Sequence, residues 1–173
     1  MEIRRIANAL GADVEGLDLS RPLAPAQRDE LNAHWLEHLV LRFRGQRLSA
    51  EQHIAFSRQF GALETHENYT PELRHPDHPE LLVVKAKTLE GRRITFGQQW
   101  HADLTYTTRP AKGSALYCLK MPAVGGDTLW ADMGAAYDCL ADEVKERIDG
   151  MVAVHDWITT FGRNMDPELR AMF

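Results

Sequence analysis

The stretch Trp100-His101-Ala102-Asp103-Leu104-Thr105-Tyr106 places an imidazole and a carboxylate two positions apart. The surrounding residues, 95–106, have a strand-like pattern, and alternate residues of a strand point to the same side. We therefore expect His101 and Asp103 to bind one cation together. A histidine and a carboxylate supply two of the three ligands of the facial triad, which binds Fe(II) and leaves coordination positions open.

The His-x-acid spacing alone is a weak signal. The sequence contains three such pairs, starting at His75, His78 and His101, and chance predicts about one in a chain of this composition. The first two have a proline between the two side chains, so strand alternation does not apply to them. We interpret them as solvated loop residues. Without further support, the pair at His101 would more often be a surface pair or a core hydrogen bond than a metal site.

Length and composition indicate one globular domain. The chain has 173 residues, of which 44% are hydrophobic and 26% charged, with a net charge of -5. This charge argues against nucleic-acid or anionic-membrane partners, which require a basic surface. No apolar run approaches the ~20 residues that span a bilayer, and the N-terminus has no signal-peptide pattern. We expect a cytoplasmic protein in which Cys118 and Cys139 are reduced, partly buried thiols.

The N-terminal part predicts short strands within residues 3–19 and a helix over residues 25–37, because Pro25 suits a first helical turn. A buried strand is expected at residues 39–43. Ser49 and Gln52 have the spacing of a capping box, which predicts a second helix ending near Gly61.

The rest of the chain mixes predicted strands and helices. Residues 62–80 are irregular, residues 90–93 form a turn, and residues 135–149 are helical with a break near Leu140. A further helix begins at residues 166–168 and runs into the end of the chain, which indicates a truncated element. Apolar and β-branched content predicts strands at residues 81–87, 114–119, 127–130 and 151–158.

Several segments in order resemble one enzyme family. Residues 100–106, Arg109-Pro110, and residues 122–133 with Gly125-Gly126-Asp127-Thr128 are similar to the core of the family that includes taurine dioxygenase and 2,4-dichlorophenoxyacetate dioxygenase. Residues 11–23 and 39–46 resemble the opening of the same family. The ordered matches extend over nearly the whole chain and are more specific than any single motif.

The resemblance implies an α+β fold with a mainly β core and flanking helices. This is the double-stranded β-helix, or jelly roll, of the clavaminate synthase-like type, here incomplete at the C-terminus. Residues 1–173 would be the N-terminal portion of a single dioxygenase domain. In the family, the second metal-binding histidine and the arginine that binds 2-oxoglutarate lie beyond this portion. We therefore expect open sheet edges, exposed apolar faces and a homo-oligomer.

The resemblance also implies roles for individual residues. His101 and Asp103 would bind Fe(II), and Thr128 would hydrogen-bond a carboxylate of the co-substrate 2-oxoglutarate. His66 and Tyr69 would contact the substrate, since an imidazole and a phenol can both donate to an anion. Without the resemblance, Thr128 would be an ordinary strand residue and His66 a loop histidine.

The substrate class stays open between a sulfonate and an aryloxyalkanoate. Where the taurine enzyme has an asparagine shortly before the metal-binding histidine, this sequence has Gly97 or its neighbours. Residues 131–138 resemble the aryloxyalkanoate branch more closely. Trp100 and Trp130 are expected to be packing residues.

The implied reaction hydroxylates a small anionic substrate with O2 and 2-oxoglutarate and releases succinate and CO2. Two other functions are compatible with the residues. One is a hydrolase that binds zinc through His66, His101 and Asp103. The other is a non-catalytic remnant that acts by association. His155 is a possible replacement for the third iron ligand, but the ordinary interpretation is a strand-end histidine paired with Asp156 or the backbone.

Overall fold

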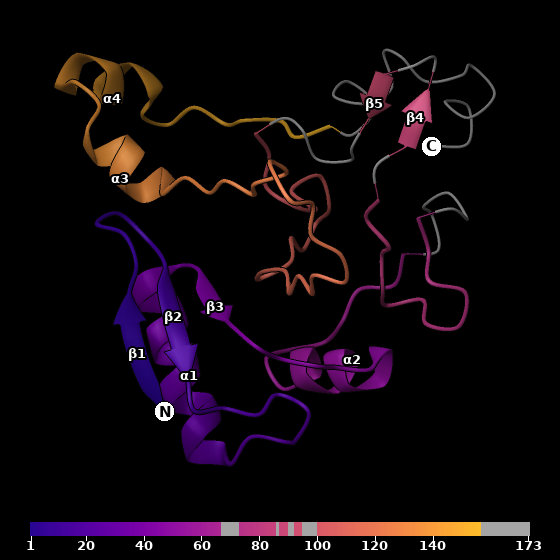
Figure 1. Ribbon diagram of the computed structural model, residues 1–173. Coiled ribbons are helices and arrows are strands. Elements are labelled where there is room, and N and C mark those ends of the chain that lie inside the picture. The colour runs from indigo at the N-terminus through magenta and orange to yellow at the C-terminus, as the bar shows by residue number, and fades with distance from the viewer. Residues whose placement is uncertain (67–72, 86, 90–91, 95–99, 157–173) are drawn as a thin grey trace. The chain divides into compact units, whose positions relative to one another are not determined.

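The computed structural model describes residues 1–66, 73–85, 87–89, 92–94 and 100–156 (Figure 1). The chain divides into two compact units. One consists of Met1–Phe96 and Ala115–Leu140, and the other of Gly97–Ser114 and Ala141–Phe173. Within the described residues, no helix has the length and apolar character needed to cross a membrane.

A three-stranded sheet organises the first unit. It contains β1 (Glu2–Arg5), β2 (Ala12–Glu15) and β3 (Leu41–Phe43), in the order β1-β2-β3. The pair β1-β2 is antiparallel and the pair β2-β3 is parallel. These strands confirm the prediction for residues 3–19 and 39–43, although the apolar side chains of β3 are only half-buried.

Both predicted N-terminal helices are present. Helix α1 (Pro25–His38) has its proline in the first turn, where the missing N–H costs no hydrogen bond. Helix α2 (Ala50–Arg58) begins with the predicted capping box. The Ser49 hydroxyl accepts a hydrogen bond from the Gln52 amide at 3.2 Å, and the Ser49 amide donates to Gln52 Oε1 at 2.8 Å.

The core of this unit joins the sheet to the two helices. Val14, Leu19, Leu31 and Phe56 are buried and form one cluster. The ring of Phe56 packs edge-on against Phe43 and Phe60, with ring centroids 5.8 Å and 5.3 Å apart. Because Leu31 comes from α1 and Phe56 from α2, these contacts fix both helices against the sheet.

A separate hairpin consists of β4 (Lys87–Leu89) and β5 (Arg92–Ile94), paired antiparallel with Leu89 opposite Arg92. Residues 90 and 91 of the predicted turn lie outside the described residues. The strand predicted at residues 81–87 is wrong for residues 81–85. These residues contribute only an isolated bridge between Arg74 and Leu82.

The predicted helix over residues 135–149 occurs as two helices, α3 (Met133–Asp138) and α4 (Asp142–Ile148). The break near Leu140 is therefore confirmed. The Asp132 carboxylate caps α3 by accepting a hydrogen bond from the Ala135 amide at 3.0 Å. The helix predicted from residue 166 lies outside the described residues.

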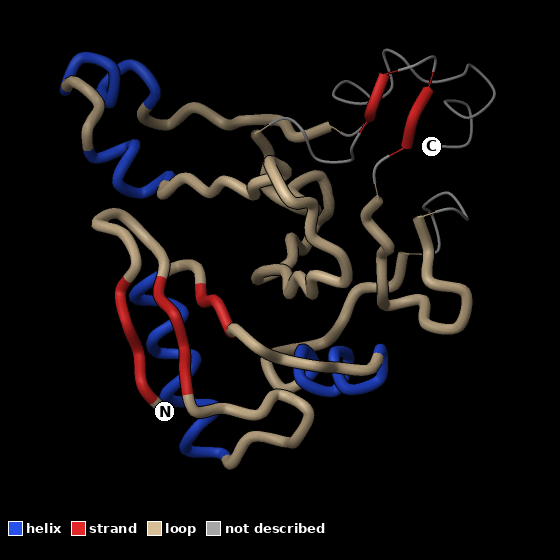
Figure 2. Tube along the Cα trace, in the orientation of Figure 1, coloured by secondary structure: helices blue, strands red, loops and turns tan. Residues whose placement is uncertain are grey.

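Four predicted strand segments are not strands in the structure. Residues 100–106, 114–119, 127–130 and 151–156 are turns and irregular backbone, drawn as loop in Figure 2. A strand needs a partner for its backbone N–H and C=O groups, and these segments pair with none in the described part of the chain. The double-stranded β-helix therefore stays a prediction.

Side-chain burial at the two tryptophans and the two cysteines also differs from expectation. Trp100 and Trp130 are 71% and 52% exposed, so their predicted packing role is wrong for this structure. Cys118 and Cys139 are free thiols as predicted, but they are exposed rather than partly buried.

Candidate metal and co-substrate site

His101 and Asp103 lie side by side directly before a turn. The His101 Nε2 and Asp103 Oδ1 atoms are 3.2 Å apart, and the two side chains are 40% and 52% exposed. The turn is fixed just after them, because Leu104 has a positive φ of 55° and its carbonyl oxygen accepts hydrogen bonds from the amide and hydroxyl of Thr107. The pair is thus confirmed as neighbours, but not through strand alternation.

The second carboxylate oxygen of Asp103 has its own partner. The Ser114 hydroxyl donates a hydrogen bond to Asp103 Oδ2 at 2.6 Å. A hydrogen bond of this kind fixes the orientation of a metal-binding carboxylate. It leaves Oδ1 on the side of His101, where one cation can contact both groups.

The spacing of the two donors fits a metal ion. Metal–nitrogen and metal–oxygen bonds of ~2.1 Å place neighbouring ligands of an octahedral ion about 3 Å apart. The observed 3.2 Å is close to that value. An imidazole nitrogen with a carboxylate oxygen is also the donor combination that Fe(II) uses in the facial triad.

His155 lies in the same unit as this pair. Its Nδ1 atom is 2.8 Å from the Thr105 hydroxyl oxygen. Within the described part of this unit, no third histidine, cysteine or acidic residue brings a ligand atom within 4.8 Å of both His101 and Asp103. His155 is therefore hydrogen-bonded to Thr105 here and does not complete the metal site.

The remaining predicted site residues belong to the other unit or lie outside the described residues. Thr128 is exposed and follows the turn at Gly125 and Gly126, whose φ angles are 73° and 79°. His66 is half-buried, and its amide donates to the Pro79 carbonyl oxygen at 2.9 Å. Tyr69 lies outside the described residues. The roles of these three residues remain predictions.

The loop histidines are less solvated than expected. The rings of His75 and His78 are half-buried, with centroids 4.8 Å apart. His78 Nε2 is 3.1 Å from Glu51 Oε1, which links the loop to α2. The interpretation as loop residues is confirmed and Asp77 is exposed, but the two histidines are only partly solvated.

One group of potential metal ligands was missed by the sequence analysis. His34, Glu37 and His38 bring ligand atoms within 4.8 Å of one another on α1. The signal was available, because residues three and four apart share one face of the helix that was correctly predicted for this segment.

An imidazole and an oriented carboxylate held side by side define a candidate metalloprotein site, and comparison with known proteins identifies the family. A sequence profile described as "Taurine catabolism dioxygenase TauD, TfdA family" matches residues 2–172. The chain belongs to this family of 2-oxoglutarate-dependent dioxygenases, as the sequence resemblance indicated.

Characterised relatives share much of the sequence. The (S)-phenoxypropionate/alpha-ketoglutarate-dioxygenase of Sphingobium herbicidovorans is 39% identical over 155 residues, which are 89% of this chain and 53% of the relative. The alpha-ketoglutarate-dependent 2,4-dichlorophenoxyacetate dioxygenase of Cupriavidus pinatubonensis is 34% identical and covers 87% of this chain and 58% of its own length. The chain therefore spans slightly more than half the length of these relatives.

Solved structures of dioxygenases are also similar to this chain. A putative alpha-ketoglutarate-dependent taurine dioxygenase from Burkholderia xenovorans has a TM-score of 0.69 at 32% identity, covering 86% of this chain and 51% of its own. The enzyme AAD-2, solved with Mn(II) and N-oxalylglycine, has a TM-score of 0.70 at 28% identity, covering 100% of this chain and 61% of its own. The fold of this chain is thus similar to part of such dioxygenases.

Proposed function

We propose that His101 and Asp103 are two of the Fe(II) ligands of a 2-oxoglutarate-dependent dioxygenase. The observation that carries this proposal is the 3.2 Å separation between His101 Nε2 and Asp103 Oδ1, with the other carboxylate oxygen held by Ser114. Two donors at this distance can contact one ion, and the hydrogen bond from Ser114 keeps Asp103 turned towards His101.

The chemistry of the site is divided between the metal and the side chains. Fe(II), when bound with 2-oxoglutarate, supplies the activation of O2 that leads to a hydroxylated substrate, succinate and CO2. Thr128 donates a hydrogen bond to a carboxylate of 2-oxoglutarate, which orients this co-substrate. His66 and Tyr69 donate hydrogen bonds to the anionic group of the substrate.

The proposed substrate is a small organic anion of the aryloxyalkanoate or sulfur-containing type. The relatives named above include enzymes for (S)-phenoxypropionate and 2,4-dichlorophenoxyacetate. Another relative, an alkylsulfatase of Acinetobacter baylyi, is 30% identical and covers 97% of this chain and 52% of its own length. A negatively charged substrate can accept the hydrogen bonds that we propose His66 and Tyr69 donate.

Anaerobic titration with Fe(II) and 2-oxoglutarate tests the proposal. Chelation of the iron by the co-substrate gives a weak visible charge-transfer band, so binding of free iron elsewhere on the chain does not contribute. We expect the band in the native chain, its loss in His101→Ala and Asp103→Ala, and a higher 2-oxoglutarate requirement in Thr128→Ala.

His75→Ala is the matched control, because His75 also begins a His-x-acid triplet. The control should keep the band. A folded native chain without the band would show that these residues do not suffice for the site. A band that persists in folded His101→Ala would refute the assignment of this ligand.

Self-association is a second candidate property, favoured by exposed apolar side chains. Leu119 and Val124 are 80% and 91% exposed, and Val152 and Val154 are 89% and 88% exposed. Several large apolar side chains exposed in each unit provide surface that contact with another polypeptide would cover. We propose a homo-oligomer, which light scattering on the purified chain would detect. A monomer at all accessible concentrations would rule it out.

A further inference from the structure

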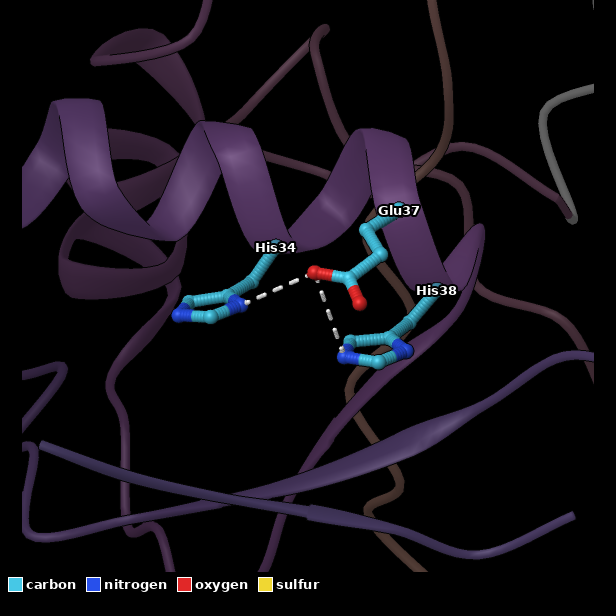
Figure 3. A group of neighbouring side chains, drawn as sticks. All are labelled: His34, Glu37 and His38. Carbon is cyan, nitrogen blue, oxygen red and sulfur yellow. Dashed lines mark ion pairs between the residues drawn. The ribbon is translucent and has the colours of Figure 1, made fainter.

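Three potential ligands share one face at the C-terminal end of α1. His34, Glu37 and His38 occupy positions i, i+3 and i+4, which are neighbours on a helix surface. Figure 3 shows the two imidazole rings and the carboxylate pointing toward one another from this helix. None of these residues was assigned to the dioxygenase site.

The donor atoms are already close to the spacing of a metal site. Glu37 Oε2 lies 3.6 Å from His34 Nδ1 and 3.8 Å from His38 Nε2. Taking one ligand atom from each residue, the three residues bring such atoms within 4.8 Å of one another. Tetrahedral zinc with bonds of ~2.1 Å separates its ligands by about 3.4 Å. Small side-chain rotations therefore bring the three atoms around one ion.

The two rings are arranged for a common ligand. They are stacked with centroids 5.9 Å apart and planes only 8° from parallel. His38 is 8% exposed, so its ring has little freedom to turn away. The parallel rings on successive helical turns each have one nitrogen within 4 Å of Glu37 Oε2.

An unpaired buried atom gives a second, independent indication. His34 Nδ1 is buried and has no hydrogen-bond partner among the described residues. Its 3.6 Å distance to Glu37 Oε2 is too long for a hydrogen bond. A buried polar atom without a partner costs free energy. A bound metal ion would satisfy this nitrogen and neutralise the carboxylate between the rings.

We propose that His34, Glu37 and His38 form a zinc site separate from the His101/Asp103 pair. Two histidines and a glutamate, with water as the fourth ligand, are an established zinc coordination set. The order His-x-x-Glu-His also occurs in a class of zinc peptidases, where the two histidines four positions apart bind zinc. Zinc is favoured over Fe(II) by the general affinity order for such donors, and a cation is favoured by the dipole at a helix C-terminus.

The bound ion would stabilise the last turn of α1, which contacts the segment before β2 through its backbone. The His38 carbonyl oxygen accepts a hydrogen bond from the Gly11 amide at 2.8 Å, at the turn that precedes β2. Leu39 then takes a positive φ of 62° where the chain leaves the helix. Zinc that holds His34 and His38 therefore stabilises the helical turn on which this connection depends.

Competition between the chain and a chromophoric zinc chelator tests the site. The titration uses the full chain carrying His101→Ala and Asp103→Ala, so that the proposed iron ligands do not contribute. We expect one zinc per chain in this background. Adding His34→Gln and His38→Gln should remove this binding, and adding Glu37→Gln should weaken it at least tenfold.

His75→Gln with His78→Gln, in the same background, is the matched control, because it removes the other pair of neighbouring histidines. Zinc binding should remain. Circular dichroism establishes that each variant is folded. Unchanged affinity in the folded His34/His38 variant would overturn the proposal. If that variant does not fold, Glu37→Gln decides, because its side chain is 65% exposed and unchanged affinity there also overturns it.

Discussion

Replacing Asp13 by asparagine is expected to destabilise the N-terminal sheet. Asp13 lies on β2, and its side chain is only 1% exposed. Its carboxylate accepts hydrogen bonds from Arg42 on β3, with Nε–Oδ1 and Nη2–Oδ2 distances of 2.6 and 3.0 Å. A third, from Arg4 on β1, is 3.0 Å long. One carboxylate therefore connects all three strands.

The expected loss of stability depends on how far the Asp13 carboxylate and its arginine partners are each buried. Removing one partner of a fully buried ion pair costs ~3–5 kcal/mol, whereas exposed pairs contribute ~0–1 kcal/mol. Asp13 is buried, but the side chains of Arg42 and Arg4 are 45% and 67% exposed and retain water. Because asparagine has nearly the same volume, no cavity is added. We expect a loss of about 2–3 kcal/mol in the free energy of unfolding.

The pH dependence has a definite sign. The hydrogen bond from Arg42 holds the pKa of Asp13 below its ordinary value of 3.8, against the opposing effect of burial. The stabilisation is therefore complete above the unfolded-state pKa and is lost as pH falls through the lower folded-state pKa. The difference between the native chain and Asp13→Asn should be constant near neutral pH and shrink below about pH 4.

Urea unfolding followed by circular dichroism measures the difference, and hydrogen exchange of the β1 and β2 amides localises it. Asp18→Asn is the matched control, because Asp18 pairs with Arg21 at 3.3 Å but its side chain is 57% exposed. The control should move the urea midpoint much less. A midpoint for Asp13→Asn equal to that of the control, with an unchanged slope, would refute the reasoning.

Three further substitutions have defined outcomes. Ser114→Ala should weaken metal binding at Asp103 by about tenfold in the iron titration, because the hydrogen bond at 2.6 Å is lost; an unchanged titration would exclude this orienting role. Ser49→Ala should cost ~1 kcal/mol in urea unfolding through loss of the α2 cap, and unaltered stability would show that water replaces the cap. Leu31→Ala should cost ~2–5 kcal/mol in the same assay, because Leu31 is 1% exposed. Leu36→Ala, at 63% exposure on the same helix, should cost far less, and equal losses would contradict the assigned core.

Local signals explain why the helices were predicted well. The proline at the start of α1 and the capping box of α2 act within one turn of backbone. Their effects therefore do not depend on where the rest of the chain lies. The family could also be recognised from the sequence, because its recognition depends on the order of several motifs and not on tertiary contacts.

Strands were predicted less well because each needs a partner elsewhere in the chain. Apolar content at residues 114–119 and 127–130 indicates surface to be covered, but it does not provide the neighbouring backbone. In the described part of the chain these residues remain irregular and exposed. Their apolar composition was recognised correctly, but the strand conformation predicted from it was wrong.

The sequence by itself determined the two capped helices, the family and the residue types of the metal pair, since these depend on neighbouring residues and on motif order. Only the tertiary structure decided which groups meet. His101 lies beside Asp103 on backbone that forms no strand, directly before the turn at Leu104. Sheet pairing brings Arg42 to Asp13 across 29 positions, and folding brings His155 to Thr105 across 50. Such contacts depend on the path of the intervening chain, which no local pattern specifies.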